Sequence, residues 1–474
     1  MPFSRRDFLQ GSGAALGALA WPGAPALAAT RPQFNLEAGV FSQKVRADGA
    51  ATEVWGFNGS VPGPVLRFAQ GDKVDLHVVN RLPQVTTVHW HGLRVPNDMD
   101  GVPHVTQHPI EMGGSFDYRF AVPDAGTYWY HPHQSSFEQV PRGLYGAFIV
   151  EEARPVKVDR EVLWLLADYK LGDDNKQVED FGKVLDFGAD GRHGNVFTIN
   201  GTAAGPDRRL ELRPNERVRL RLINAASARL FRLEFGGHAP WVVSYDGQPV
   251  SPHPIPEGKL FLAPGQRTDL VIDGSAAPGD SHAVVDRRGT GTQIASITYA
   301  GKPVRARPLG RPAPMAPNRL TEPRLDKATQ HYLMFEGGVK GMPAIGQVDG
   351  KPMKVEEIMA QHGITWTMNY TAQHEHAMMH EPLFHMKRGE HVVLRMVNNT
   401  NFEHPMHLHG HFFRVLAHNG KPNPMREWRD TVILGPRGNC DIAFVADNVG
   451  EWMFHCHILD HAAGGMMGTV VVGD

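Results

Sequence analysis

Residues 71–80 read GDKVDLHVVN, and the same pattern recurs as NERVRLRLIN at 215–224 and as GEHVVLRMVN at 389–398. Each segment begins in a turn, continues as an alternation of apolar and polar residues, and ends at an asparagine. Alternation with a period of two is typical of a β-strand with one buried face. The segments are a domain length apart, which predicts three copies of one β-domain rather than a short-period repeat.

The composition favours the same architecture. Among 474 residues there are 51 Gly and 36 Pro, which indicates many turns and short strands. We therefore expect an all-β protein of three Greek-key β-sandwich domains, at 31–152, 158–301 and 324–474. The Pro- and Arg-rich residues 302–323 are either a linker or an ordered strap lying across a domain face.

The N-terminus resembles a targeting segment. SRRDFL at 4–9 is a twin-arginine signature, and an apolar stretch and the cleavage pattern ALA at 26–28 follow it. We expect residues 1–28 to be a signal peptide for the twin-arginine (Tat) export machinery, which implies a periplasmic protein. An N-terminal anchor is the alternative, although the apolar stretch is short for a membrane span.

The charge balance excludes two classes of partner. The net charge is −2, and no basic patch or further long apolar stretch is present. The sequence therefore indicates no nucleic-acid binding and no stable membrane insertion.

Four histidine motifs stand in the first and third copies. They are HWHG at 89–92, HPH at 131–133, HPMHLHG at 404–410 and HCHILDHAAGGM at 455–466. The first His-x-His pair follows the end of segment 71–80 at the same distance as the pair at 407 and 409 follows the end of segment 389–398. At these offsets the middle copy has Leu233 and Phe235, so we expect it to hold no metal and to serve in spacing and packing.

The spacing of HCH predicts two kinds of metal site. Successive side chains of a strand point to opposite faces, so Cys456 must face away from His455 and His457. A thiolate, two imidazoles and a weak axial methionine form the ligand set of an electron-transfer copper. Cys456 supplies the thiolate, and His404, His461 and Met466 complete the set.

The remaining eight histidines form four His-x-His pairs, each with both imidazoles on one face of a strand. We expect them to share several copper ions in a cleft between the first and third domains, an arrangement suited to O2 because several reduced metals can deliver electrons together. Structural zinc uses four ligands in a closed shell, which does not explain eight paired imidazoles. Cys440 lies in a strand-like run and is expected in the core, so no disulfide is predicted.

These motifs resemble those of the multicopper oxidase family, in particular its three-domain laccase-like members. The resemblance implies cupredoxin-like domains that bind four copper ions: a type 1 ion, a type 2 ion and a type 3 pair. By position it implies as ligands His404, Cys456, His461 and Met466 for type 1, His89 and His407 for type 2, and His91, His131, His133, His409, His455 and His457 for type 3. The family oxidises a reducing substrate at type 1 and reduces O2 to water at the other three ions.

Two positions bear on the supply of protons. Asp100 resembles the acidic residue that assists proton delivery in the family, and a turn-forming Asp before Gly is the alternative. Many bacterial members carry an acidic residue directly after the type 1 histidine that follows the cysteine. This chain has Ala462 there and Asp460 before His461, which leaves the proton path on that side undecided.

The electron donor is less clearly marked. Residues 353–386 contain six methionines and five histidines, a set that suits Cu(I) and resembles the Met-rich segments of periplasmic cuprous oxidases. Gap-filling methionines are the alternative. We expect a laccase-like oxidase of phenolic or other aromatic donors; the alternative is a periplasmic oxidase of Cu(I) in copper tolerance. The complete ligand set argues against a non-catalytic relative.

Overall fold

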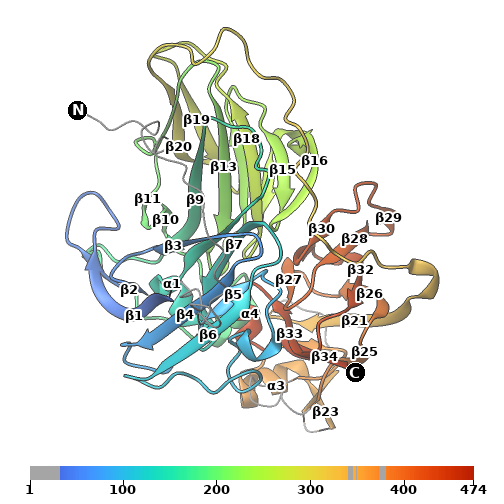
Figure 1. Ribbon diagram of the computed structural model, residues 1–474. Coiled ribbons are helices and arrows are strands. Elements are labelled where there is room, and N and C mark those ends of the chain that lie inside the picture. The colour runs from blue at the N-terminus through green and yellow to red at the C-terminus, as the bar shows by residue number, and fades with distance from the viewer. Residues whose placement is uncertain (1–32, 340–344, 349, 373–380) are drawn as a thin grey trace, which may run out of the picture. The chain divides into compact units, whose positions relative to one another are not determined.

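Strands dominate the computed structural model, which describes residues 33–339, 345–348, 350–372 and 381–474 (Figure 1). The expectation of an all-β protein is confirmed. The predicted signal peptide, residues 1–28, lies outside the described residues.

The first copy of the repeat consists of two four-stranded sheets around one core. Leu76 and Phe148, from opposite sheets, are both fully buried in that core. One sheet has the order β2 (Thr52–Phe57), β1 (Gln33–Gln43), β4 (Lys73–Asn80) and β6 (Ser115–Ala121). The other has the order β3 (Gly63–Ala69), β8 (Gly146–Glu151), β7 (Gly126–His131) and β5 (His89–His91).

The middle copy has a larger pair of sheets. The first runs β11 (Thr202–Ala203), β10 (Val196–Ile199), β9 (Arg160–Tyr169), β13 (Arg217–Asn224), β18 (Arg267–Asp273), β15 (Trp241–Tyr245) and β16 (Gln248–Pro254). The second runs β12 (Arg209–Leu212), β20 (Thr292–Tyr299), β19 (Ser281–Asp286), β14 (Phe231–Phe235) and β17 (Leu260–Leu262). Apolar residues of both sheets form its core.

The third copy carries most of the predicted ligands. Its first sheet runs β24 (Trp366–Met368), β21 (Thr329–Gly337), β26 (Glu390–Asn398), β32 (Asn439–Ala446), β28 (Phe413–His418) and β29 (Lys421–Pro422), with β30 (Trp428–Arg429) beside β28. Its second runs β25 (Phe384–Lys387), β34 (Met467–Gly473), β33 (Gly450–Cys456), β27 (His404–Leu408) and β31 (Thr431–Leu434). The short strands β22 (Ile345–Val348) and β23 (Lys351–Lys354) pair separately.

The three repeated segments occupy one position in the three copies. They form β4, β13 and β26, and each pairs in parallel with the first strand of its copy and antiparallel with a later one. The terminal asparagine has one role throughout. The side-chain oxygens of Asn80, Asn224 and Asn398 each accept a hydrogen bond from the main-chain N–H two residues on, at 2.9–3.0 Å. This local bond stabilises the turn that ends each strand.

The α-helices are short, as expected from the composition. They are α1 (Ser136–Arg142), α2 (Val184–Gly188), α3 (Val355–His362) and α4 (Leu459–Ala463). Within the part of the chain that the structure describes, no helix is long and apolar enough to cross a membrane.

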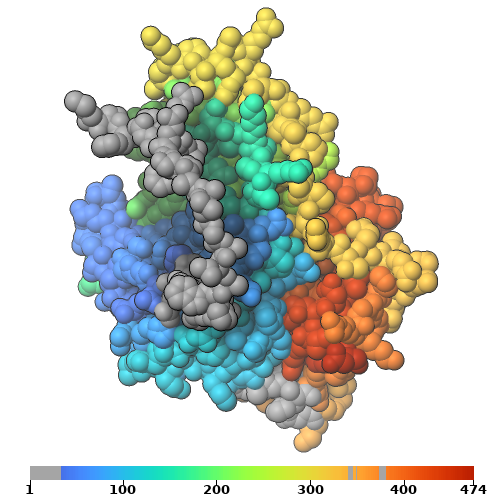
Figure 2. Space-filling model, in the orientation of Figure 1, coloured from blue at the N-terminus to red at the C-terminus, as the bar shows by residue number. Residues whose placement is uncertain are grey.

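Residues 302–323 form an ordered, extended strap rather than a free linker. Asn318 donates to Ala125 O of the first copy at 2.8 Å and to Gln248 Oε1 of the middle copy at 3.0 Å. Arg305 bonds to Asp159 and to Asn215 O. In Figure 2 the gold-coloured strap lies on the molecular surface, where it passes from the middle copy to the third.

Candidate metal centre

A cysteine and two histidines converge in the core of the third copy. His404 begins β27, Cys456 ends β33 and His461 lies in α4. Cys456 Sγ is 3.7 Å from His404 Nδ1 and 3.6 Å from His461 Nδ1, and the two Nδ1 atoms are 3.0 Å apart. All three side chains are fully buried, and their ligand atoms are close enough to surround one metal ion. We call these residues, with Met466, the cysteine cluster.

Bonds on the far side of each imidazole determine which nitrogen faces this cluster. His461 Nε2 donates to Ala189 O of the middle copy at 2.6 Å, and His404 Nε2 lies 2.8 Å from Thr400 Oγ1. The Nδ1 atoms are thereby left for a metal. Met466 is fully buried, and its carbonyl accepts from Cys456 N at 3.0 Å. Main-chain bonding thus returns the loop after α4 to the cysteine.

The other eight predicted histidines meet where the first and third copies adjoin. In the first copy β5 pairs with β7, which places His89 opposite His131. In the third copy β27 pairs with β33, which places His407 opposite His455. The four strands lie together in Figure 1. We call these eight residues the histidine cluster.

Ring contacts join the two halves of the histidine cluster. His91 stacks on His407 and His89 stacks on His409, each pair with ring centroids 3.8 Å apart. Each stacked pair takes one ring from each copy. The cluster is therefore assembled only when the first and third copies pack against each other.

Unpaired nitrogens in the histidine cluster fit bound metal. The buried ring nitrogens with no hydrogen-bond partner are His89 Nε2, His91 Nδ1, His131 Nε2, His407 Nε2 and both nitrogens of His457. Buried polar atoms are normally paired, so such a concentration of unpaired acceptors calls for an explanation. Neutral imidazole is a good ligand for copper, and several ions shared among these rings satisfy the free nitrogens.

Burial favours the neutral form of most of these histidines. It lowers the pKa of every ligand histidine for which a shift is resolved, with neighbouring histidines adding to the effect in most of them: His91, His131, His133, His404, His407, His409, His455, His457 and His461. For His461 the pKa falls to about 3. Burial also raises the pKa of the Cys456 thiol, so a metal ion is needed to hold it as a thiolate.

Two aspartates support the histidine cluster in matching ways. His89 Nδ1 donates to Asp100 O at 2.8 Å, and Asp100 Oδ2 accepts from His409 Nδ1 at 2.7 Å. His407 Nδ1 donates to Asp430 O at 2.9 Å, and Asp430 Oδ1 lies 3.4 Å from His91 Nε2. Each aspartate thus contacts one ligand from its own copy and one from the other. Sequence reasoning missed Asp430, because no motif in WRDTV marks it.

Asp460 and Ala462 flank His461, and both are buried. Asp460 accepts from Arg192 N at 2.9 Å through Oδ2. Burial raises the pKa of Asp460 to about 7. The carboxyl group of Asp460 is therefore held by the main chain of the middle copy.

A small pocket of about 160 Å³ opens beside His461. Its walls come from the middle and third copies, and they include the charged residues Asp190, Arg288 and Glu403 and the imidazole of His193. Arg288 and Glu403 pair with each other at 2.8 Å. An electron donor in this pocket would contact a residue of the cysteine cluster directly.

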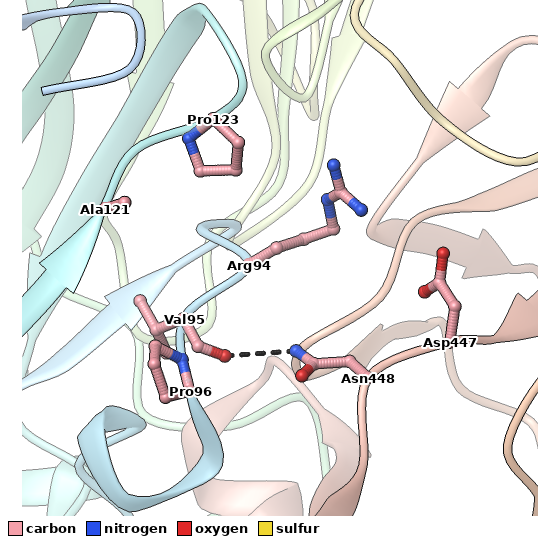
Figure 3. Close-up of a pocket in the computed structure, with 7 residues that line it drawn as sticks. All are labelled: Arg94, Val95, Pro96, Ala121, Pro123, Asp447 and Asn448. Carbon is pink, nitrogen blue, oxygen red and sulfur yellow. Dashed lines mark hydrogen bonds between the residues drawn. The ribbon is translucent and has the colours of Figure 1, made fainter.

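A larger pocket of about 530 Å³ lies at the junction of the first and third copies (Figure 3). Asn448 Nδ2 closes one side by donating to Val95 O at 3.0 Å. Arg94 bonds to Asp124 at 2.7 Å. None of the lining residues is a predicted ligand, so this pocket is separate from the cysteine and histidine clusters.

The described methionines of residues 353–386 serve mainly in packing. Met368 and Met386 are buried in the core of the third copy, and Met353 packs against a small cluster around Ile358. Of the densest part of the predicted Cu(I) segment, HEHAMMHEPLFHM at 374–386, residues 374–380 lie outside the described residues. Gap-filling therefore accounts for these three methionines.

Comparison with known proteins identifies the family. Three multicopper oxidase family models match residues 40–155, 160–302 and 348–474. A multicopper oxidase of Mycobacterium tuberculosis, MmcO, is 31% identical over 98% of this chain and 95% of its own length. Copper resistance protein A of Escherichia coli is 26% identical over 99% of each chain.

Solved structures agree. A crystal structure of a multi-copper oxidase from Pseudomonas thermotolerans matches with a TM-score of 0.81 and 31% identity, over 93% of this chain and 99% of that one. A multicopper oxidase from Campylobacter jejuni, described as a metallo-oxidase, matches with a TM-score of 0.76 and 26% identity, over 93% of this chain and 91% of that one. The chain belongs to the multicopper oxidase family. It is a copper-dependent oxidoreductase, and its family binds four copper ions.

Proposed function

We propose that this oxidase takes single electrons from a small reducing substrate at the cysteine cluster and reduces O2 to water at the histidine cluster. His404, Cys456, His461 and Met466 are the proposed type 1 ligands, His89 and His407 the type 2 ligands, and the other six histidines the type 3 ligands. Bound copper would supply the one-electron steps at the first cluster and O2 reduction at the second.

The observation that carries this proposal is the tripeptide at the end of β33. Cys456 is grouped with His404 and His461, while His455 is grouped with His133 and His409. Adjacent residues of one strand thus belong to different clusters. The main chain that joins them is a short covalent route for electrons.

The pocket beside His461 supports a small donor. Its volume of about 160 Å³ lies below the 300–1,000 Å³ typical of sites for drug-sized ligands. Phe402 and Leu230 supply apolar walls, and Asp190 and Glu403 supply acceptors for a hydroxyl group. We propose that a phenol or similar single-ring donor binds here, as in laccases.

Oxidation of Cu(I) is the second candidate, because relatives include a copper resistance protein and a metallo-oxidase. In the same pocket, the imidazole of His193 offers a nitrogen ligand that suits copper. The donor would then be a metal ion that passes its electron to the cysteine cluster through His461.

Oxygen uptake by fully metallated protein distinguishes the two candidates. The rate is measured with a substituted phenol and with Cu(I), in the wild type, in Asp190→Asn, and in a chain lacking residues 374–380. Asp174→Asn, an exposed carboxylate that does not line the pocket, is the control. A phenol KM raised in Asp190→Asn alone supports the phenolic donor. Efficient Cu(I) turnover without phenol turnover contradicts it. Loss of the Cu(I) turnover on deletion of 374–380 would assign Cu(I) binding to that segment, and its persistence would favour the pocket beside His461.

We further propose that residues 31–152, 158–301 and 324–474 are the domains.

We also propose that the twin-arginine signature directs export to the periplasm. Replacing Arg5 and Arg6 by Lys should leave the protein in the cytoplasm on cell fractionation. Unchanged periplasmic recovery of the double variant would contradict the proposed route.

A further inference from the structure

A tight turn of the middle copy packs against the histidine cluster, although that copy supplies no predicted ligand. Residues 263–267, APGQR, connect β17 to β18. A Cβ atom on Gly265 would lie 2.7 Å from His457 Cδ2 and 3.1 Å from His91 Cε1. Gln266 Nε2 donates to Thr431 O of the third copy at 3.0 Å. The turn is therefore in van der Waals contact with the ligand rings.

Arg267, the last residue of this turn, joins all three copies. Its guanidinium is fully buried and donates to both carboxylate oxygens of Asp430, at 2.8 and 2.5 Å. Its Nε donates to Thr127 O of β7 at 3.1 Å, and its main-chain N donates to Asp246 at 2.9 Å. A bidentate pair of this kind holds the carboxylate in one orientation.

Asp430 transmits that orientation to two ligands from different copies. Its carbonyl accepts from His407 Nδ1 at 2.9 Å, which leaves His407 Nε2 free, and its Oδ1 lies 3.4 Å from His91 Nε2. Thr431 Oγ1 donates to the same carboxylate oxygen at 2.8 Å. Bonds of this kind set the tautomer and ring orientation of metal-binding histidines.

The glycine of HWHG fits this arrangement. Gly92 has a φ of +85°, and a Cβ there would lie 2.3 Å from Arg267 Nη2 and 2.6 Å from Asp430 Oδ2. The absence of a side chain after His91 thus makes room for the ion pair. The motif accommodates a partner that comes from another copy.

We propose that Arg267 is a positioning residue of the histidine cluster. It holds the carboxylate of Asp430 in one orientation, and through Asp430 it orients the rings of His407 and His91. The middle copy, which supplies no predicted ligand, thus helps to shape the copper site. The inference rests on the proposed assignment of the eight histidines as copper ligands.

The test compares Arg267→Gln and Arg267→Lys with Arg219→Gln. Arg219 is also fully buried, but it bonds to Asp269 and Glu152 rather than to Asp430. The rate of copper loss to a chelator, the type 2 electron paramagnetic resonance signal and the blue absorption are recorded for each metallated variant, with the unfolding midpoint. We expect Arg267→Gln to lose histidine-cluster copper about 10- to 100-fold faster than the wild type, with blue absorption retained.

The two other variants complete the comparison. Arg267→Lys keeps the positive charge but loses the bidentate pairing of the guanidinium with the carboxylate. Its rate of copper loss should therefore lie between those of the wild type and Arg267→Gln. Arg219→Gln should lower the unfolding midpoint without changing copper loss or the type 2 signal. Equal copper loss and unaltered type 2 signals in the Arg267 and Arg219 variants would overturn the inference.

A double-mutant cycle tests whether the effect passes through Asp430. If it does, Arg267→Gln/Asp430→Asn loses copper no faster than Asp430→Asn alone. Fully additive losses would overturn the proposed route. A wild type that binds no copper at the histidine cluster would instead refute the proposed function, so the two failures are distinguishable. Should Arg267→Gln not fold, Arg267→Lys and the type 2 signal decide the question.

Discussion

At the scale of single residues, two aspartates outside the histidine motifs orient the histidines of the motifs. Asp100 and Asp430 each accept a hydrogen bond from a histidine of their own copy through the main chain. Their carboxylates face a histidine of the other copy. The ligands are therefore held in a tautomer ready for metal before any ion binds.

Replacing Asp100 by Asn tests the predicted role of this residue in proton delivery. Asn can still accept from His409 but cannot supply a proton at neutral pH, so kcat should fall by about 100-fold or more for every donor. The blue absorption should persist, because the contacts of Asp100 are to the histidine cluster. Oxygen uptake at saturating donor and the visible spectrum measure the two effects. Unchanged turnover would contradict the predicted role in proton delivery.

A pH dependence of stability is expected from Asp246, which accepts from Arg267 N at 2.9 Å. Burial and the nearby Asp430 raise its pKa from 3.8 to about 6. The folded chain therefore binds more protons than the unfolded chain between about pH 4 and 6, so the contribution of Asp246 to stability declines as pH rises through 6. The difference between a pKa of 3.8 in the unfolded chain and about 6 in the folded chain corresponds to about 3 kcal/mol in the free energy of unfolding.

Asp246→Asn removes this dependence. In urea unfolding of the copper-free protein, the stability of the variant relative to the wild type should increase from pH 4 to pH 7. Asp180 is a control of opposite sign: burial acts to raise its pKa, but Lys170 and Arg192 lower it below its usual value. The wild type should therefore lose stability relative to Asp180→Asn as pH falls. A relative stability of Asp246→Asn that does not vary with pH contradicts the assignment.

At the scale of elements, strands and turns bring the clusters together. The separation of Cys456 from His455 into different side-chain groups could be predicted from the sequence, because side-chain alternation along a strand is local geometry. The repeated asparagine was visible in sequence, and its bond to the main-chain N–H two residues on explains it. The role of the 263–267 turn was not predictable, because its contacts with Asp430 span 163 residues of chain.

Gly265→Ala tests the contact between this turn and the histidine cluster. Gly265 has a φ of +82°, and the added Cβ would lie 2.7 Å from His457 Cδ2, so the ring must move and copper should be lost. Gly258→Ala is the matched control, since its φ is +69° and no atom lies within 4 Å of the added Cβ. Both should lose about 1 kcal/mol of stability through backbone strain. Equal copper content in the two variants would contradict the proposed contact.

At the scale of the whole molecule, the histidine cluster exists only where the copies meet. The matched offsets in the first and third copies predicted only that these two copies, and not the middle one, supply the His-x-His pairs. The sequence could not show that Arg267 of the middle copy bonds to Asp430 beside the histidine cluster. It also could not show that Ala189 O of the middle copy accepts a hydrogen bond from His461 Nε2. It also left the strap at 302–323 undecided, since composition alone does not report hydrogen bonds to distant copies.

Copper content per polypeptide after saturating reconstitution tests the two-cluster account most directly. The wild type should bind four ions and absorb as a blue copper protein. Cys456→Ser should remain folded, bind three ions at the histidine cluster, lose the blue absorption and turn over no donor. A wild type with fewer than four ions, or a Cys456→Ser variant that stays blue, would contradict the account.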